Sequence, residues 1–422
     1  RVTKKSKNYY EGFVERIVTP SKDRLEPFCQ HFGVCGGCKW QPLPYPMQLE
    51  AKRQQVYDQL VRIGHLNVPE IRPTIPSDKI QYYRNKLEFT FSSKRWLLKD
   101  EDIESVPENY RMGLGFHVGK FFDKVLDIKH CYLQKDPSND IRLFIKKYAV
   151  ENGLDFFDIR QNVGYVRNMF IRTTDTGDLM VIMCFFYENR EDREKMLDAI
   201  AEAFPQITSL YYIINNKLND SIGDQECILY KGEPTIRETM ESLTFRIGPK
   251  SFYQTNSEQA YKLYSVARDF AELTGNEIVY DLYTGTGTIA QFVSGKAARV
   301  IGIEYVPEAI EDAKVNAAGN GITNCEFFAG DMKDVLRRDF INEHGQPDVI
   351  ILDPPRAGIH PDVAKVILEA SPARMVYVSC NPASQARDLA LFADKYDITA
   401  VQPVDMFPHT QHVENVCALR LR

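Results

Sequence analysis

The repeating order of strand, turn and helix from about residue 251 onward constrains the fold of this chain most. Its apolar runs end in polar turns and read IVYDLY, RVIGIEY, CEFFAGD, DVIILDPP, MVYVSCNP, ITAVQPVDMF and VCALRLR, with helical stretches such as PEAIEDAKVNAAGNG between them. This pattern is typical of a mostly parallel sheet with helices on both faces. We therefore predict an α/β domain over residues 251–422, in which ligands bind beyond the carboxyl ends of the strands.

A glycine turn follows the first of these strands. Residues 281–288 (DLYTGTGT) end a strand and open a helix, so the backbone can approach a ligand at the helix N-terminus. Glu304 ends the next strand, where a carboxylate can bind both hydroxyls of a ribose. The pair predicts an adenosine-type cofactor but leaves NAD and S-adenosylmethionine open, because residues 285–290 (GTGTIA) also fit the dinucleotide fingerprint. Asp331, at the third strand end, is either an adenine contact or a helix N-cap.

The fourth and fifth strand ends carry the candidate reacting groups. Asp353 begins the stiff loop DPPRAG, which would hold this acid at the edge of the cofactor. Methyltransferases that act on exocyclic amino groups place an aromatic residue where Arg356 stands, so amino-group methylation is disfavoured. Cys380, in SCNP, lies near the start of the next helix, and we expect the positive end of that helix to lower the pKa of the thiol. A lone cysteine is otherwise more often a buried apolar residue.

A thiol at this place suits methylation of carbon 5 of uracil. That carbon is a weak nucleophile, but a thiolate that adds at carbon 6 turns the ring into an enolate that is nucleophilic at carbon 5. The carbon 5 proton must then leave, and Glu414, just before the last strand, is the candidate base. Gln254, in SFYQTN, could pair with polar edges of the base or cofactor, whereas Phe252 and Tyr253 taken alone suggest core. We expect His409 and His412 to pack in a loop rather than to bind a metal.

The first 250 residues predict accessory structure. Residues 76–250 contain alternating runs such as YRNKLEFTFS and LMVIMCFF, which indicate an α+β domain. The net charge of −6 means that any nucleic-acid binding depends on local basic surface. Residues 1–24 are such a surface, since their basic side chains outnumber acidic ones by seven to three and are interleaved with Tyr9, Tyr10 and Phe13. The alternative is a solvated edge strand.

Three of the nine cysteines fall within ten residues. Cys29, Cys35 and Cys38 are too close together in the sequence for the evenly spaced disulfide framework of a secreted protein. Such crowding indicates a metal or cluster site in a reducing compartment. Four thiolates suit either zinc or an iron–sulfur cluster, and the spacing does not decide between them.

Several motifs together resemble the RNA 5-methyluridine methyltransferase family, and more closely its RlmD-like, ribosomal-RNA branch. The resemblance runs from about residue 27 to the end of the chain. It rests on the stretches PFCQHFGVCGGC, YRNKLEF, SFYQTN, DLYTGTG, DPPRAG, SCNPASQARDL and MFPHTQHVE. It implies a Rossmann-like S-adenosylmethionine-dependent methyltransferase sheet, an α+β accessory domain that binds RNA and an N-terminal iron–sulfur region.

The resemblance also implies residue roles. Cys380 would be the nucleophile and Glu414 the proton acceptor. The positions that contact S-adenosylmethionine would be Gln254, Tyr283, Thr288, Glu304, Asp331 and Asp353. Thr284 and Thr288 depart from the commoner Cys and Asn, which puts only contact detail in doubt. A [4Fe-4S] cluster would be held by Cys29, Cys35, Cys38 and the distant Cys131.

The resemblance further implies how the N-terminal region is divided. Residues 1–22 resemble the final strand of a truncated, TRAM-like β-barrel domain, and residues 23–75 would form the cluster region. Because residue 1 is Arg and the opening stretch already alternates like a strand, we expect that the chain is a fragment.

We therefore expect an enzyme that methylates carbon 5 of a uridine in RNA, with 23S ribosomal RNA as the target and transfer RNA as the alternative. A non-catalytic RNA-binding or assembly factor and an NAD-dependent dehydrogenase are the alternatives of other classes. No apolar run is long enough to cross a bilayer and no signal arrangement opens the chain, so we expect a cytoplasmic protein without a membrane. Nothing in the sequence implies a protein partner.

Overall fold

The apolar runs after residue 251 pair into one seven-stranded sheet in the computed structural model, which describes all residues except 8, 99–100, 103, 108–110 and 120. The strand order is β14-β13-β12-β15-β16-β18-β17, and only β18 runs antiparallel to its neighbours. The strands are β12 (Ile278–Leu282), β13 (Arg299–Glu304), β14 (Cys325–Ala329), β15 (Val349–Leu352), β16 (Arg374–Ser379), β17 (Tyr396–Val404) and β18 (Glu414–Leu421). The predicted, mostly parallel sheet is therefore present.

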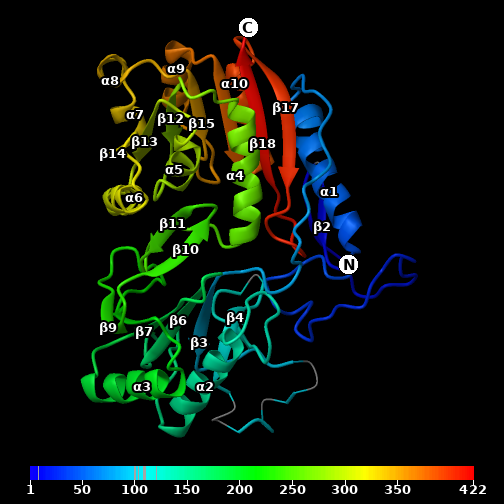
Figure 1. Ribbon diagram of the computed structural model, residues 1–422. Helices are drawn as coiled ribbons and strands as arrows, with labels where there is room; N and C mark the ends of the chain where they lie inside the picture. Colours follow the sequence, from blue (N-terminus) through cyan, green and yellow to red (C-terminus); the bar gives the residue numbers. More distant parts are fainter. Residues whose placement is uncertain (8, 99–100, 103, 108–110, 120) are drawn as a thin grey trace.

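Helices cover both faces of this C-terminal sheet (Figure 1). Successive strand residues point to opposite faces, so Val279 packs with one set of helices and Tyr280 with the other. The first set is α4 (Ser257–Ala271), α5 (Thr288–Ser294) and α6 (Pro307–Gly319). The second is α7 (Met332–Val335), α8 (Arg338–His344), α9 (Pro361–Ala370) and α10 (Pro382–Phe392), joined by α1 (Tyr45–Tyr57) and its π-helical continuation η1 (Asp58–Ile63).

The middle of the chain forms a second seven-stranded sheet of mixed direction, in the order β5-β4-β3-β6-β7-β8-β9. Two helices, α2 (Ser138–Glu151) and α3 (Arg190–Ala203), pack on one of its faces. The strands are β3 (Lys86–Ser92), β4 (Gly113–His117), β5 (Val125–Asp127), β6 (Val166–Thr173), β7 (Leu179–Phe185), β8 (Ser209–Ile214) and β9 (Ile228–Gly232). A hairpin of β10 (Ile236–Met240) and β11 (Leu243–Ile247) leads from this sheet into α4.

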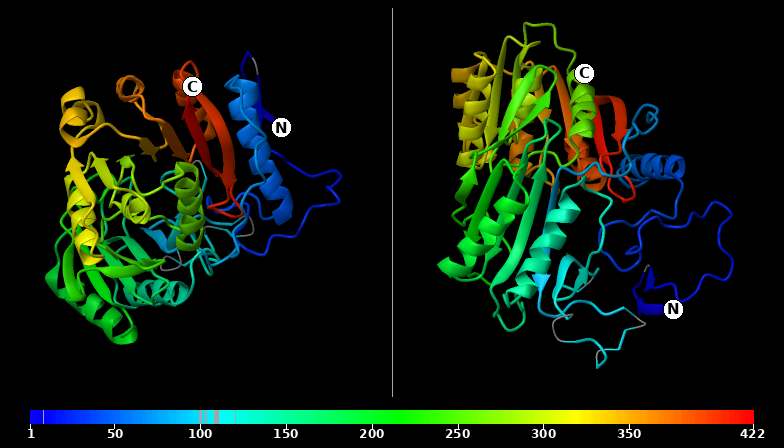
Figure 2. Two further views of the ribbon diagram at one scale, coloured as in Figure 1. Left: turned by 45° about the horizontal axis from the view of Figure 1, so that its top comes forward. Right: turned by 60° about the horizontal axis from the view of Figure 1, so that its bottom comes forward.

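The first residues differ from the single strand that we expected. They form a hairpin of β1 (Val2–Lys5) and β2 (Tyr10–Gly12), because the chain turns back where the Ser6 N–H donates to the carbonyl of Tyr9. Both strands are exposed, and in both views of Figure 2 the N-terminal segment lies outside the two sheets. Lys4 pairs with Glu11 and Lys5 lies over the ring of Tyr10, so the expected interleaving of charge and aromatic side chains is present.

Within the described part of the chain, no helix combines the length and the apolar composition needed to span a bilayer.

Candidate active site

A cleft of about 1200 Å³ opens where the carboxyl ends of the C-terminal strands face the middle region of the chain. It is lined by the glycine turn, the DPPR loop, residues 248–255 and residues from the β8–β9 connection. Seven of the predicted residues share this cleft, namely Gln254, Tyr283, Thr288, Glu304, Asp353, Cys380 and Glu414. The structure therefore brings the predicted nucleotide and reacting groups into one space.

The glycine turn is held by the buried side chain of Asp281. Its Oδ2 accepts hydrogen bonds from the Thr284 hydroxyl at 2.5 Å and from the Ala290 N–H at 2.9 Å. Gly287 has φ of +73°, and an added Cβ would lie 2.8 Å from the ring of Phe327, so this position requires glycine. A Cβ at the preceding Gly285 would meet nothing within 4 Å, which leaves that backbone open to a ligand.

Glu304 is fixed against the same turn. One carboxylate oxygen accepts from the Gly285 N–H and the other from the Val306 N–H, both at 3.1 Å. A carboxylate that is already oriented at the end of the second strand can receive the hydroxyls of a ribose. Asp331 is placed differently, because it caps α7, pairs with Lys333 at 3.0 Å and does not line the cleft.

The DPPR loop is tied to the neighbouring helix by hydrogen bonds. The carbonyl of Arg356 accepts hydrogen bonds from the Asn381 side chain and the Ser384 hydroxyl, both at 3.1 Å, which ties the loop to the start of α10. Asp353 lies at its base, where burial and the neighbouring Asp281 raise the pKa of its carboxyl to about 7.

Antiparallel pairing sets Cys380 beside Glu414. Ser379 at the end of β16 pairs with Asn415 in β18. The next residue, Cys380, therefore lies opposite Glu414. Glu414 is 5% exposed, and burial followed by Asp353 raises the pKa of its carboxyl to about 8, against a lowering effect of Arg356.

The expected lowering of the thiol pKa was wrong. Burial, then the carboxyls of Glu414 and Asp353, raise the pKa of Cys380 to about 11. These effects outweigh the positive end of α10, because the dipole of a helix contributes less than desolvation and two nearby acids. The thiol is therefore protonated in this state of the protein.

The aromatic residues before α4 divide between core and cleft. Tyr253 is 8% exposed, as expected of a core residue, whereas Phe252 is 65% exposed and its ring borders the cleft. Phe407 borders the cleft as well, with the guanidinium of Arg84 over its ring at 5.2 Å.

Comparison with known proteins decides the family. The sequence profile of the tRNA (uracil-5-)-methyltransferases matches residues 169–422. The chain is 59% identical to an uncharacterized RNA methyltransferase of Porphyromonas gingivalis over 99% of this chain and 92% of the relative. It is 58% identical to one of Bacteroides thetaiotaomicron over 100% and 94%. The chain belongs to the tRNA (uracil-5-)-methyltransferase family.

A solved structure of this family has the same architecture. The Pyrococcus abyssi tRNA (uracil-54, C5)-methyltransferase in complex with S-adenosyl-L-homocysteine superposes with a TM-score of 0.76 at 29% identity, over 99% of this chain and 91% of that one. The predictions of an α/β methyltransferase fold, of an RNA (uracil-C5-)-methyltransferase and of an RNA substrate are thereby confirmed. The NAD-dependent dehydrogenase is no longer an alternative.

The four predicted cluster cysteines of this methyltransferase also meet in one place. Cys29, Cys35, Cys38 and Cys131 line a single cavity of about 330 Å³. Burial raises the pKa of Cys131 to about 12 and also raises the pKa values of Cys35 and Cys38. Among the described residues, no three His, Cys, Asp or Glu side chains lie close enough to hold a single metal ion. The His409 ring lies within hydrogen-bond distance of the Gln48 side chain.

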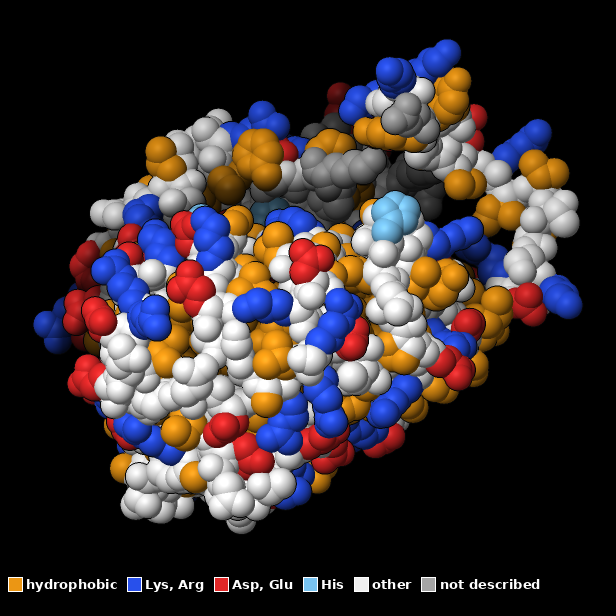
Figure 3. Space-filling model, turned by 90° about the horizontal axis from the view of Figure 1, so that it is seen from above, with side chains coloured by type: hydrophobic (Ala, Val, Ile, Leu, Met, Phe, Trp, Pro, Cys, Tyr) orange, Lys and Arg blue, Asp and Glu red, His pale blue; other side chains and the backbone are white. Residues whose placement is uncertain are grey.

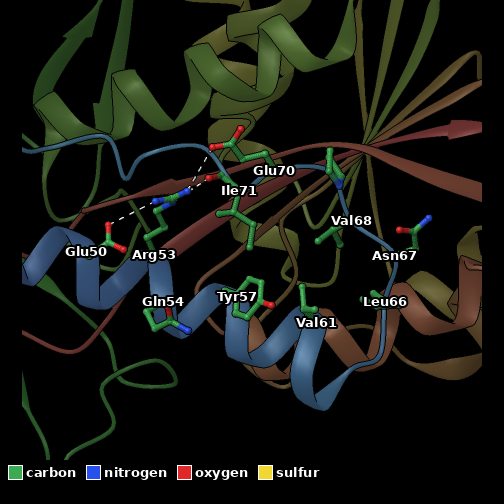
Figure 4. Close-up of a pocket in the computed structure, with 11 residues that line it drawn as sticks. Glu50, Arg53, Gln54, Tyr57, Val61, Leu66, Asn67, Val68, Glu70 and Ile71 are labelled. Carbon is green, nitrogen blue, oxygen red and sulfur yellow. Dashed lines mark hydrogen bonds and ion pairs between the residues drawn. The ribbon is translucent and has the colours of Figure 1, made fainter.

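A further pocket, of about 420 Å³, lies away from these residues between α1–η1 and residues 66–71 (Figure 4). Its walls include Val61, Leu66 and Val68, and Arg53 reaches Glu50 and Glu70 beside it. None of the predicted site residues lines it, so the large cleft is the candidate active site of the methyltransferase.

Surface charge is mixed on the face shown in Figure 3, where lysine and arginine side chains alternate with aspartate and glutamate. This distribution agrees with the near balance of basic and acidic residues in the sequence, whose net charge is −6.

Two features of the site were not predicted. Lys52 forms a fully buried ion pair with Asp405, and the β8–β9 connection contributes Gly223, Glu226 and Cys227 to the cleft. The first had no signal in the sequence, because Gln48 and Lys52 are polar and only the structure shows that they lie on the buried side of α1. The second had none that we can identify, because it depends on how two sheets meet.

Proposed function

We propose that this chain transfers the methyl group of S-adenosylmethionine to carbon 5 of a uridine in RNA, with Cys380 as the nucleophile and Glu414 as the base. The observation that carries the proposal is the pairing of this thiol with a buried carboxyl on the cleft that the glycine turn also lines. The donor would lie against the turn, with Glu304 on its ribose and Gln254, Tyr283, Thr288 and Asp353 around it. Asp331 stays a predicted adenine contact.

The first step forms a carbon–sulfur bond. The thiol of Cys380 loses its proton to solvent, and the sulfur adds to carbon 6 of the uracil, while the electrons of the 5,6 double bond move into an enolate. The raised pKa of Cys380 means that this step needs a nearby positive charge, and a sulfonium bound beside Asp353 supplies one.

The next steps transfer the methyl group and restore the ring. Carbon 5 takes the methyl group from the sulfonium, whose bonding electrons return to sulfur and leave a neutral thioether. The carboxylate of Glu414 then takes the carbon 5 proton, the 5,6 double bond re-forms, and Cys380 leaves as a thiolate. A pKa of about 8 makes Glu414 a stronger base than an exposed glutamate and still leaves part of it ionised near neutral pH.

RNA that contains 5-fluorouridine tests the covalent step. Fluorine replaces the proton that Glu414 would remove, so the enzyme should remain attached to the RNA after methyl transfer. We expect that wild type and Cys325→Ala form the complex on denaturing gels, since Cys325 does not line the cleft, and that Cys380→Ala does not. Equal trapping by Cys380→Ala would overturn the assignment, and no trapping by any variant would favour the non-catalytic RNA-binding factor.

For the target we propose a uridine of 23S ribosomal RNA. The support is the four-cysteine cavity, which the resemblance associates with the ribosomal branch, whereas the solved Pyrococcus relative is named for uracil-54 of tRNA. Mapping 5-methyluridine in both RNAs from cells that lack the protein decides between them. Loss of the modification from tRNA alone would make the chain a tRNA enzyme.

For the cavity we propose a [4Fe-4S] cluster on Cys29, Cys35, Cys38 and Cys131. All four cysteines line the same 330 Å³ cavity, and no group close enough to hold a single metal ion is present among the described residues. Sulfurs around one zinc lie within roughly 4 Å of each other, whereas a cluster spreads its ligands over a wider volume. When bound, the cluster would fix this region of the fold and would not itself react.

Anaerobic reconstitution with iron and sulfide tests the cluster directly. We expect iron and sulfide in equal amounts and the visible absorption of a cluster in the wild type, and loss of both in Cys131→Ala but not in Cys325→Ala. Zinc as the only metal retained by the purified protein would overturn the proposal.

A further inference from the structure

The β17–β18 connection, residues 405–413, decides where the proposed base lies. β17 ends at Val404, which pairs with Glu414 at the start of β18, and Phe407 within the connection borders the cleft. On one side α4 holds it, because the Gln259 side chain donates to the Asp405 carbonyl at 2.9 Å and the Asn256 side chain to the Met406 carbonyl at 3.0 Å.

Helix α1 holds the other side through a buried charge. The Lys52 ammonium bonds the Asp405 carboxylate at 2.5 Å, and both side chains are 0% exposed. The same ammonium donates to the Phe407 carbonyl at 3.1 Å, and the Asp405 carboxylate accepts from the Phe407 N–H at 3.1 Å. One lysine on α1 therefore fixes both ends of the turn that presents Phe407 to the cleft.

Gln48, one helical turn earlier, holds the next part of the connection. Its amide oxygen accepts from the His409 N–H at 2.9 Å, and its nitrogen lies 3.1 Å from His409 Nδ1 and donates to the Trp40 carbonyl at 3.1 Å. The N–H groups of Lys39 and Trp40 donate to the His409 carbonyl at 2.8 and 2.9 Å. The segment directly after Cys38 is thereby bonded to the chain that leads to Glu414.

Stability of the fold alone does not explain these buried polar contacts. A buried ion pair loses much of its Coulombic gain to desolvation, and well-packed apolar side chains of similar size are often as stable or more so. What the hydrogen-bonded lysine and glutamine provide beyond apolar packing is a fixed direction for the backbone groups that they bond.

We propose that Lys52 and Gln48 are positioning residues, which keep the β17–β18 connection in the one arrangement that aims Glu414 at carbon 5. This inference rests on the proposed function. Removal of the proton needs Glu414, whereas addition of Cys380 to the ring depends on β16. A substitution of Lys52 or Gln48 should therefore slow removal of the proton more than it slows the addition. A purely structural role would slow both steps together or lower only the amount of folded enzyme.

Single-turnover reactions on ordinary uridine RNA separate the two steps. We expect that Lys52→Met leaves the rate of adduct formation within about twofold and slows release of methylated RNA about tenfold to a hundredfold, the range that a displacement of about 1 Å costs. Methylated enzyme–RNA adduct should therefore accumulate. Arg53→Met is the matched control, because Arg53 bonds Ile71, Glu50 and Glu70 and does not touch the connection.

A double variant separates positioning from charge burial. Lys52→Met with Asp405→Asn removes the unpaired carboxylate, so we expect it to regain thermal stability relative to Lys52→Met while release stays slow, because the bond to the Phe407 carbonyl is still missing. Recovery of release in the double variant, or equal slowing of both steps in Lys52→Met, would overturn the inference. Glu414→Gln is the reference, and if it fails to accumulate adduct, the proposed function fails instead.

Discussion

The protein has two thiol sites, and their neighbours differ more than their burial does. Cys380 stands beside two carboxyls, which together with burial raise its pKa to about 11. The four thiols of the other cavity have one another as neighbours, and burial raises the pKa of Cys131 to about 12. Cys380, Cys35, Cys38 and Cys131 are therefore protonated until a cation arrives, because the pKa of each is raised. The two uses that we propose for these thiols, bond making by Cys380 and iron binding by the other four, therefore depend on their neighbours rather than on their burial.

The largest effect should come from Cys380→Ser, which tests whether the cleft thiol reacts. A hydroxyl is a far weaker nucleophile than a thiolate, so we expect methyl transfer to fall by about 10⁴-fold or more. Transfer of labelled methyl groups to RNA in single-turnover reactions measures it, with calorimetric binding of S-adenosylhomocysteine as the control for folding. Transfer within tenfold of the wild type would remove the distinction between the two thiol sites.

Glu414→Gln tests the carboxyl that only the first site has. Loss of a positioned base costs typically 10²- to 10⁴-fold, and we expect this loss in release of methylated RNA, with adduct accumulating on ordinary uridine. Denaturing gels measure the adduct. Glu311→Gln, on the exposed surface of α6, should behave as the wild type. Free methylated RNA at the normal rate would show that another group takes the proton.

Cys131→Ser tests whether the second site is independent of the first. Loss of a tightly held cluster removes its contribution to the folded state, which is about 3–4 kcal/mol for a ligand present at several hundred times its Kd. We therefore expect a lower Tm and no bound iron. Trapping on 5-fluorouridine RNA, counted per folded molecule, should change by less than about twofold. A complete loss of trapping would mean that the two sites act as one.

The pH dependence gives the smallest effect. Burial raises the pKa of Glu414 to about 8, and a protonated carboxyl cannot accept the carbon 5 proton, so the single-turnover rate of release of methylated RNA should rise about tenfold per pH unit below that value and level off above it. Adduct formation requires the thiolate, and the pKa of the thiol is about 11, so the rate of that earlier step should still rise above pH 8. Rates measured from pH 6 to 9 test this, and Glu414→Gln should lose the inflection. A plateau that begins near pH 5 would contradict the raised pKa.

The sequence predicted those parts of the fold that have long apolar runs. All seven C-terminal strands were expected from such runs, because strands buried on both faces are apolar throughout. β4 (Gly113–His117) and β5 (Val125–Asp127) were not, because they are short and become strands only through pairing, β4 with β3 and β5 with β4. The single strand expected over the first residues is a hairpin, because a turn near Ser6 interrupts the alternation.

The sequence also predicted those parts of the candidate site that follow from the topology of the sheet. Parallel strands end at one edge, so Glu304, Asp353 and Cys380 could be placed together from topology alone. The direction of the shift in the thiol pKa could not be, because it depends on burial and then on the carboxyl of Glu414, which lies beside Cys380 only through the antiparallel β18. The pair of Lys52 with Asp405 joins residues 353 positions apart, a contact that no local pattern reports.

The place of β18 between β16 and β17 has a consequence for synthesis. The ribosome makes Cys380 and the glycine turn well before residues 414–421. Those residues form β18, which pairs between β16 and β17, and both of these strands are synthesised earlier. A nascent chain without residues 414–421 would thus hold the Cys380 thiol without its proposed proton acceptor. The proposed chemistry therefore requires that β18 is in place.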